Sequence, residues 1–432
     1  MDTNKMSNIK YIYSIIKEGN IPLFRELYGR NSELLHQQAV RYTKTLSRFK
    51  EVFGDKEISV FSAPGRTEIG GNHTDHNHGR VLAGAVNLDN IAIAAKNNSN
   101  IIRIESSGYQ SFEVDLNHLA PNENEFLTPD ALVRGINARL KELGYGIGGF
   151  DAVIDGCVPK GSGLSSSASF EVLIGVIISH LFNEGKLDPI LNARVGQYAE
   201  NIFFGKPCGL MDQVACSVGG LVSIDFADIA NPIVKKVDFD FESTGFSLVI
   251  TDSRGDHTNL NNEYAVLPKE MKDVATHLGC GVLRETTLEK VMDIAPSIRQ
   301  KVGDRAILRA IHFECENDRV VDEVMALEKN DFKKFLQLVI DSGHSSYMYN
   351  QNVYVSSNIK EQAVSLGLAY SEVVLKGTGA WRVHGGGFAG TIQAFVPEDL
   401  LERYITTLNH LFGAGSCHPL FIRQKGAVKL DF

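Results

Sequence analysis

Apolar residues recur at helical spacing through most of the first 50 residues. In "SELLHQQAVRYTKTLSRFKEVFG" they stand three or four positions apart, as on one face of an amphipathic helix. Gly54 follows the last of them, where a glycine commonly ends a helix. The pattern predicts a helical N-terminal region that ends near residue 54.

Period-two alternation then takes over and predicts strands. "ISVFS", "FEVDL" and "FDAVIDGCV" all alternate in this way. "IAIAAK" and "IIRIES" flank the turn-like "NNSN", so we expect these two segments to pair as a β-hairpin. "ASFEVLIGVIISHLF" returns to helical spacing and predicts a helix.

The second half of the chain repeats this grouping of strands and helices. "GFSLVITDS" predicts a strand, and helical patterns follow around 263–279, 285–300, 303–345 and over "SSNIKEQAVSLGLA". "GGFAGTIQAFVP" then predicts a turn and strand, and "PEDLLERYITTLNHLFG" a helix. Strands and helices grouped in blocks predict an α+β fold in two lobes.

Composition and charge exclude several classes of partner. The chain has 432 residues and a formal charge of −9, which argues against nucleic acid or an anionic membrane as its partner. No stretch reaches the 18 apolar residues of a spanning helix, and the first residues lack a signal-peptide pattern. Six scattered cysteines without a C-x-x-C pair indicate reduced thiols, so we expect a cytoplasmic protein.

"GGNHTDHNHG", residues 70–79, concentrates histidines and an aspartate between glycines. His73, Asp75, His76 and His78 are residue types that bind zinc. The same groups can also bind the hydroxyls of a polar ligand. Spacing alone leaves both interpretations open.

"VPKGSGLSSSASFEV", residues 158–172, is a candidate phosphate site. A strand leads into a Gly/Ser loop, and the loop leads into a helix whose first N–H groups are unpaired. It is neither a Walker A loop, since no Lys-Ser/Thr pair follows the glycines, nor a dinucleotide fingerprint. An ordinary capped turn is the alternative interpretation.

Two further stretches add acids and glycines. Glu200 and Asp212 lie in "AENIFFGKPCGLMDQVACSVGG", and an acid near a phosphate can hold Mg²⁺ or accept a hydroxyl proton. "GTGAWRVHGGGFAG" has three consecutive glycines, which permit close approach of a ligand. Taken separately, the acidic stretch would be explained by two solvated carboxylates, and the glycine-rich stretch by a tight structural turn.

Together these stretches occur in the order typical of the kinases named for galactokinase, homoserine kinase, mevalonate kinase and phosphomevalonate kinase. Within that superfamily the chain most closely resembles galactokinases. Their usual signature, roughly PGRVNLIGEHTDYNGG, stands here as "PGRTEIGGNHTDHNHG". "GLSSSAS", "CGLMDQ" and "LNNEYAVLPKEM" also match, as do "RAIHFECENDRV" and "DSGHSSYMYNQNVYVSSNIK", so the resemblance covers about residues 40–430.

The resemblance implies a two-lobed small-molecule kinase fold with its active site between the lobes. We expect an N-terminal helical extension over 1–36, which lies beyond the usual family start. An N-terminal kinase domain with the sugar signature and the phosphate loop would span 37–240. A C-terminal kinase domain with the GGGFAG loop would span 241–432.

The resemblance also implies roles for individual residues. By this resemblance, "HTD" would bind the hydroxyls of a sugar rather than a metal ion. Asp212 and Arg66 would be the catalytic residues. Sugar contacts would come from Asn72, His73, Asp75, Gly209 and Tyr264. Backbone groups of the phosphate loop would bind ATP, namely Gly161, Gly163, Leu164, Ser165, Ser166, Ser167, Ala168 and Ser169. Ser167 and Glu200 would hold Mg²⁺.

The chain departs from the usual signature at Asn72, where galactokinases normally carry Glu. "EIGG" likewise replaces "NLIG", His384 replaces a small hydroxyl residue, and Ala389 replaces a glycine. Compared with Glu, the Asn side chain keeps a hydrogen-bond acceptor, adds a donor and lacks the negative charge. If Asn72 contacts the exocyclic end of the sugar, the exchange would shift specificity by about 1–3 kcal/mol.

The expected function is therefore an ATP-dependent sugar 1-kinase that converts galactose to galactose 1-phosphate. A 1-kinase for N-acetylgalactosamine, L-arabinose or a galacturonate is the first alternative. A galactose and ATP sensor without catalysis is the second, and "GLSSSAS" and Asp212 argue against it, because some such sensors lack a Ser-Ala pair in this signature. We expect a monomer or a homodimer.

Overall fold

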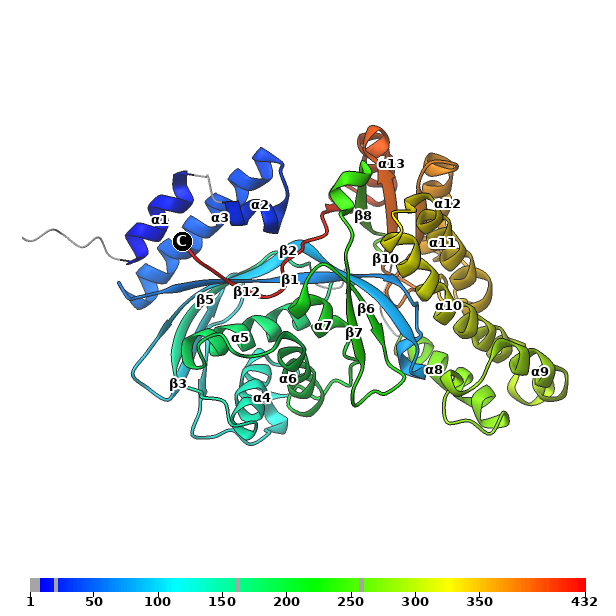
Figure 1. The fold of residues 1–432 in the computed structure, drawn as a ribbon, viewed down its shortest axis with the longest axis horizontal. Helices are drawn as coiled ribbons and strands as arrows, with labels where there is room; N and C mark the ends of the chain where they lie inside the picture. The colour runs from blue at the N-terminus through cyan, green and yellow to red at the C-terminus, as the bar shows by residue number, and fades with distance from the viewer. Residues whose placement is uncertain (1–7, 19–21, 160–162, 256–259) are drawn as a thin grey trace, which may run out of the picture.

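The computed structural model describes residues 8–18, 22–159, 163–255 and 260–432. Two β-sheets organise the molecule, and helices cover both faces of each sheet (Figure 1). The mixed α/β architecture agrees with the predicted class. Gly161, one of the predicted phosphate ligands, lies outside the described residues.

The N-terminal region is helical, as predicted. It forms α1 (Asn8–Glu18), α2 (Pro22–Tyr28) and α3 (Ser32–Phe53). The side chain of Asn31 caps α3 at its start, and Gly54 ends it with a φ of 80°. These helices pack their apolar faces on one side of the larger sheet (Figure 1).

The larger sheet has the strand order β12-β1-β2-β5-β3-β4, with β6 paired to β2 and β7 to β6. Strand β2, 17 residues long, pairs with β5 through one half and with β6 through the other. The strands are β1 (Ser59–Gly70), β2 (Arg80–Lys96), β3 (Ile101–Ser106), β4 (Phe112–Asp115), β5 (Phe150–Gly156), β6 (Leu221–Asp225), β7 (Ile233–Val237) and β12 (Val428–Leu430).

The predicted hairpin between "IAIAAK" and "IIRIES" is wrong. The chain does reverse direction at the predicted turn, but β5 lies between the two strands, antiparallel to β2 and parallel to β3. The turn crosses the start of β5, where Asn97 N–H donates to the carbonyl of Gly149 at 3.0 Å. Because β5 is buried, the backbone N–H and C=O groups along both of its edges need partners, and β2 and β3 supply them.

Four helices cover the other face of the larger sheet: α4 (Pro129–Glu142), α5 (Ser166–Phe182), α6 (Pro189–Ile202) and α7 (Met211–Val218) (Figure 1). Helix α5 packs against β1 and β2 and against its neighbouring helices, and is buried over most of its length. Its first turn therefore stands where the phosphate loop meets the sheet. Across the residues that the structure describes, no helix is both long and apolar enough to span a membrane.

The second sheet has the order β11-β8-β10-β9. Along β8, Leu248 and Ile250 face the core beneath α10 and α11, while Val249 faces α12 and α13. The predicted helix over "SSNIKEQAVSLGLA" begins only at Ala363. The elements are β8 (Phe246–Asp252), β9 (Ala380–His384), β10 (Thr391–Pro397), β11 (Cys417–Leu420), α8 (Asn261–His277), α9 (Leu288–Val302), α10 (Asp304–Glu328), α11 (Phe332–Ser345), α12 (Ala363–Leu375) and α13 (Leu401–Phe412).

The two lobes share packing at their junction. One apolar cluster combines Ile69 and Leu82 of the larger sheet with Leu248 and Phe395 of the smaller one. After the smaller sheet, the chain returns as β12 to pair with β1. The predicted boundary at 36/37 falls inside α3, and the boundary at 240/241 stays a prediction.

Asp89 on β2 is the centre of a buried polar cluster that ties both ends of the chain to the larger sheet. Its carboxylate accepts from Tyr28 Oη at 2.7 Å, pairs with Arg41 Nη1 at 2.6 Å and pairs with Arg423 Nη1 at 3.2 Å. Burial alone would raise the pKa of Asp89, but the two guanidinium groups outweigh it, and the pKa is lowered. The N-terminal helices are therefore anchored by charge as well as by apolar packing.

We expect Arg41→Met to destabilise the protein strongly. Removing one partner of a buried ion pair typically costs about 3–5 kcal/mol, because the remaining charge is left under-compensated. Urea unfolding should show this loss. Arg403→Met, on the exposed face of α13, is the matched control and should stay near wild type. Equal stability of the two variants would contradict an anchoring role for the Asp89 cluster.

Candidate active site

The sugar-signature loop is a tight turn between β1 and β2. After Gly70 the chain passes through a short 3-10 helix, Asp75–Asn77, before β2 begins. Thr74 Oγ1 donates to the carbonyl of Gly71 at 2.9 Å and holds the turn closed. His73 adopts a left-handed φ of 60°, which a non-glycine residue adopts only where its surroundings hold it there.

His73 links this loop to the triple-glycine loop of the other lobe. Its Nε2 lies 3.0 Å from the carbonyl of Gly386, which can only accept, so Nε2 carries the proton. Burial, assisted by nearby His76, lowers the pKa of His73 to about 4, so the ring is neutral at neutral pH. Within the described part of the chain Nδ1 has no hydrogen-bond partner, and it is therefore an acceptor for a ligand hydroxyl.

Asp75 and Gly209 lie against each other. A Cβ on Gly209 would stand 2.9 Å from Asp75 Oδ2, so a larger residue there would force this carboxylate to shift. The Asp75 side chain is 21% exposed and accepts locally only from the N–H of His76 at 3.0 Å. Two of the predicted sugar residues therefore lie together, and Gly209 stands three residues before the predicted base Asp212 in the sequence.

Asp212 is held from two sides. Arg66 Nε donates to Asp212 Oδ1 at 2.7 Å, and Ser165 Oγ donates to Asp212 Oδ2. The Arg66 guanidinium also donates to the carbonyl of Gly163, and the Arg66 backbone N–H donates to the carbonyl of Leu164. Arg66 therefore joins the acid to the phosphate loop. Arg66 is buried, whereas the Asp212 side chain is 32% exposed, which leaves it accessible to a substrate.

The phosphate loop presents free backbone donors. Ser165 has a left-handed φ of 56°, and α5 begins at the next residue. Among the residues described, no side chain caps the first turn of α5. The N–H groups of Ser166, Ser167 and Ala168 belong to that first turn and have no intrahelical partner. With the partial positive charge of a helix N-terminus, they suit an anionic phosphate.

Two of the predicted phosphate residues make contacts within the protein. Ser169 Oγ donates to the carbonyl of Ala63 at 2.8 Å and accepts from Asn90 at 2.9 Å, and its N–H donates to Ser165 at 3.1 Å. Leu164 is fully buried, and its carbonyl accepts from Arg66. The prediction for Ser169 fails because its donors are already used within the protein.

Tyr264 packs on the triple-glycine loop. Its hydroxyl donates to the carbonyl of Gly387 at 3.0 Å, and its ring meets Phe388 edge-on with centroids 5.4 Å apart. A Cβ on Gly386 would lie 2.7 Å from the Tyr264 ring, which explains the glycine at this position. The residue thus stands beside the loop that His73 also contacts, and its role at a sugar stays a prediction.

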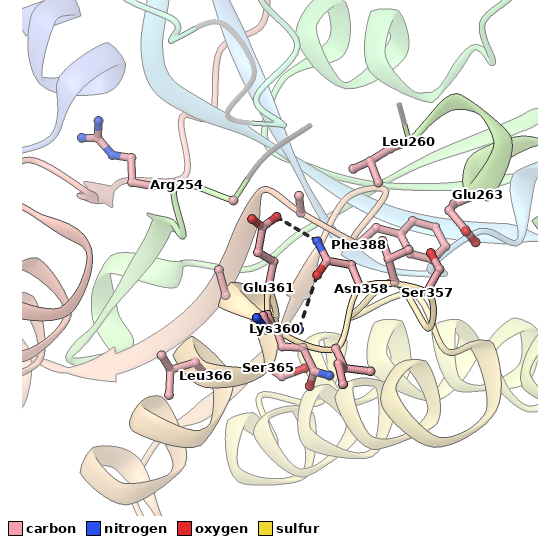
Figure 2. A pocket seen from close by; sticks show the side chains of 16 residues that line it. Arg254, Leu260, Glu263, Ser357, Asn358, Lys360, Glu361, Ser365, Leu366 and Phe388 are labelled. Atoms are coloured by element: carbon pink, nitrogen blue, oxygen red, sulfur yellow. Dashed lines mark hydrogen bonds between the residues drawn. The ribbon is translucent and has the colours of Figure 1, made fainter. Parts of the chain in front are cut away.

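A large cavity opens beyond this loop. It has a volume of about 1110 Å³ and is lined by Leu260, Glu263, Asn358 and Phe388, among others (Figure 2). Asn358 donates to Glu361 at 3.0 Å across its floor. Asp212 is not among the residues that line this cavity.

The histidine cluster shows no metal-binding arrangement. His76 is exposed, and its ring centroid lies 6.4 Å from that of His73. Over the described ranges, no group of three or more His, Cys, Asp or Glu side chains is placed to hold a metal ion. The loop is better described by its contacts with the triple-glycine loop.

Comparison with known proteins agrees with this geometry. Residues 47–96 match the galactokinase galactose-binding signature, and residues 131–220 match the N-terminal domain of GHMP kinases. The chain is a kinase by these matches, and it resembles the GHMP kinases and galactokinase in particular. These two matches contain Arg66, the sugar loop, the phosphate loop and Asp212.

Solved structures extend the likeness over nearly the whole chain. Galactokinase from Lactococcus lactis, complexed with galactose, is similar with a TM-score of 0.75 and 26% identity, covering 90% of this chain and all of that one. Two further structures share the fold. Methanococcus jannaschii mevalonate kinase has a TM-score of 0.60 and 15% identity, covering 84% of this chain and 98% of that one. Streptococcus pneumoniae phosphomevalonate kinase, in complex with phosphomevalonate and AMPPNP, has a TM-score of 0.56 and 15% identity, covering 86% of this chain and 99% of that one.

The kinase differs from expectation at Asn72, which is fully buried. Asn72 Nδ2 donates to Glu68 at 2.9 Å and to the carbonyl of Gly385 at 2.8 Å. Its Oδ1 accepts from Ser346 at 3.1 Å and from Asn352 at 2.8 Å. Both donors and both acceptor positions are used by the protein, so in this structure Asn72 offers no polar atom to a sugar.

The kinase also has an acid that the sequence interpretation missed. Glu171 lies four residues after Ser167 on α5, and Gln213 Nε2 bridges it to Glu200 at 3.0 and 2.9 Å. Glu171 Oε1 is buried without a hydrogen-bond partner in the described residues. Burial and the neighbouring Glu200 carboxylate raise the pKa of Glu171. Its helical spacing from Ser167 is the signal that could have identified it.

Proposed function

We propose that the kinase transfers the γ-phosphate of ATP to the anomeric oxygen of galactose. The observation that carries the proposal is the placement of Asp212, held by Arg66 and Ser165 and three residues from the Gly209–Asp75 contact. An acid so placed can meet a sugar hydroxyl on one side and the phosphate loop on the other. The similarity to a galactokinase complexed with galactose supports the choice of sugar.

On the sugar side, the acceptors are Asp75 and His73. Two vicinal hydroxyls would donate to the Asp75 carboxylate, and a third would donate to His73 Nδ1. The anomeric hydroxyl would donate to Asp212, which takes its proton as the oxygen attacks the γ-phosphorus. The new O–P bond forms while the bond to the β-phosphate oxygen breaks, and ADP leaves.

On the phosphate side, the N–H groups of the α5 first turn would bind the phosphates, and Arg66 would stabilise the charge in transfer. The donor set also fits Mg²⁺, which prefers carboxylate and hydroxyl oxygens and keeps waters and phosphates as its other ligands. Ser167 and Glu200 would hold the ion, beside the orphaned oxygen of Glu171. When bound, Mg²⁺ neutralises charge on the β- and γ-phosphates.

A screen over free sugars tests the proposal. ATP consumption is measured with galactose, N-acetylgalactosamine, L-arabinose and galacturonic acid, each with Mg²⁺. We expect the highest kcat/KM for galactose and a product whose phosphorus couples to H1 in NMR spectra. A phosphate on C6, or no turnover with any sugar, would refute the 1-kinase proposal.

The same screen separates an enzyme from a sensor. Some galactokinase-like sensors lack a Ser-Ala pair in the phosphate signature, whereas Ser167 and Ala168 are present here. A sensor would bind galactose and ATP in calorimetry without producing ADP. A cytoplasmic location and a monomeric or dimeric state remain predictions from the sequence.

A further inference from the structure

Behind the sugar loop, a buried cluster of Glu68, Asn72 and Arg382 connects the two lobes. Glu68 Oε1 accepts from Asn72 Nδ2 and from Arg382 Nη2, both at 2.9 Å. Arg382 is fully buried on β9 and also donates to the carbonyl of Ile69. The charge of Glu68 is thus balanced from the C-terminal lobe, and its remaining contact goes to the loop that carries His73.

Glu68 and Asn72 are exchanged relative to the usual signature. Aligned with PGRVNLIGEHTD, the chain carries Glu at position 68 in place of Asn, and Asn at position 72 in place of Glu. Because the two side chains contact each other, the exchange keeps one carboxylate and one amide in the same buried pair.

We infer that Glu68 and Asn72 act as an exchanged carboxylate–amide pair that, with Arg382, positions the sugar loop against the triple-glycine loop. Three contacts join the two loops. Asn72 donates to the carbonyl of Gly385 at 2.8 Å, and His73 to that of Gly386 at 3.0 Å. Asn352 also bridges Asn72 and Gly386. The pair therefore determines where His73 stands, which makes both members positioning residues for the proposed sugar site.

The surroundings forbid a carboxylate at position 72 while Glu68 is present. Glu316 accepts from the N–H groups of Gly71 and Asn72 at 3.1 and 3.3 Å and pairs with Arg319. Burial opposes this charge, but Arg319, Arg382 and the other neighbouring donors together outweigh it and lower the pKa of Glu316 to about 2. A glutamate at 72 would add another carboxylate between Glu68 and Glu316 and would replace a donor that now meets two acceptors.

Gly70 belongs to the same arrangement. A Cβ at Gly70 would stand 1.8 Å from Glu323 Oε2, so the side chain of the usual signature has no room here. Glu323 is fully buried on α10 and occupies that space. Position 70 therefore differs from the usual signature where Glu323 fills the space beside the sugar loop.

A four-member comparison tests the pair. Wild type is compared with Asn72→Glu, Glu68→Asn and the double variant, by melting of the ligand-free protein and by kcat and KM for sugar and ATP. We expect each single change to raise the sugar KM roughly tenfold or more and to lower Tm, with the ATP KM within about twofold. The double variant should regain most of both losses. Single effects that simply add in the double variant would overturn the inference.

Two further variants keep the test decisive. Glu68→Gln removes the charge but keeps an acceptor, so adding it to Asn72→Glu should recover Tm or soluble expression if the single variant folds poorly. A double variant no better than Asn72→Glu alone would also overturn the inference. Asn98→Glu, at an exposed turn, is the control for adding a charge.

The melting comparison is independent of the proposed function on which the sugar effect rests. Coupled melting without turnover of any sugar would refute the galactose proposal and support the pair. Turnover of galactose without coupled melting would support the galactose proposal and overturn the inference about the pair.

Discussion

Asp212→Asn is expected to lower kcat by about 10²–10⁴-fold, the usual contribution of a general base. The amide keeps the size of the carboxylate, its oxygen can still accept from Arg66, and its NH2 group can donate to the Ser165 hydroxyl, so the local structure should persist. It cannot take the proton of the sugar hydroxyl. Steady-state kinetics with the sugar identified in the screen would measure the loss, and calorimetry should show sugar affinity within a few-fold of wild type.

The control for this variant is Asp399→Asn, an exposed carboxylate after β10, which should leave kcat unchanged. A second variant, Ser165→Ala, removes one of the two groups that hold Asp212 and should give a smaller loss. If Asp212→Asn retained more than about a third of wild-type kcat, Asp212 would have no essential role in proton transfer.

Arg66→Met is expected to lower kcat/KM by about 10²–10³-fold, the range for losing one donor to developing charge. The buried guanidinium serves two parts of the site at once. It pairs with Asp212 at 2.7 Å, and it donates to the carbonyl of Gly163 in the phosphate loop. Its removal should therefore displace the acid and the loop together, and the KM values for both ATP and sugar should rise.

Arg66→Lys is the matched comparison for this variant. Lysine keeps the positive charge but lacks the planar fork that reaches two partners, so we expect an activity between those of wild type and Arg66→Met. Lysine restoring full activity would mean that charge alone matters at this position. A KM change confined to ATP would contradict the link to Asp212.

Several local features were predictable from the sequence because neighbouring residues determine them. The amphipathic spacing around α3, its Gly54 end and the turn into α5 all follow from local backbone and side-chain preferences. The order of the glycine-rich stretches indicated the kinase family, and with it the roles proposed for Arg66 and Asp212. Gly209 and Asp75, two of the predicted sugar residues, lie against each other in the structure.

Other features depend on partners far away along the chain. The turn after β2 was predictable, but its pairing was not, because β5, some fifty residues later, takes the place beside β2. Asn72 looked like a sugar contact from its motif, yet Ser346 and Asn352, more than 270 residues away, saturate its oxygen. No local pattern reports whether a polar side chain already has a buried partner.

The sequence by itself therefore determined the helical spacings, the loop–helix junction of the phosphate site and the family. Only the tertiary structure decided that Ser169 and Asn72 are used internally, that Glu171 joins Glu200, and that Asp89 anchors the N-terminal helices. The physical reason is that a polar group in the interior needs a partner within hydrogen-bond distance. The fold, and not the neighbouring sequence, supplies that partner.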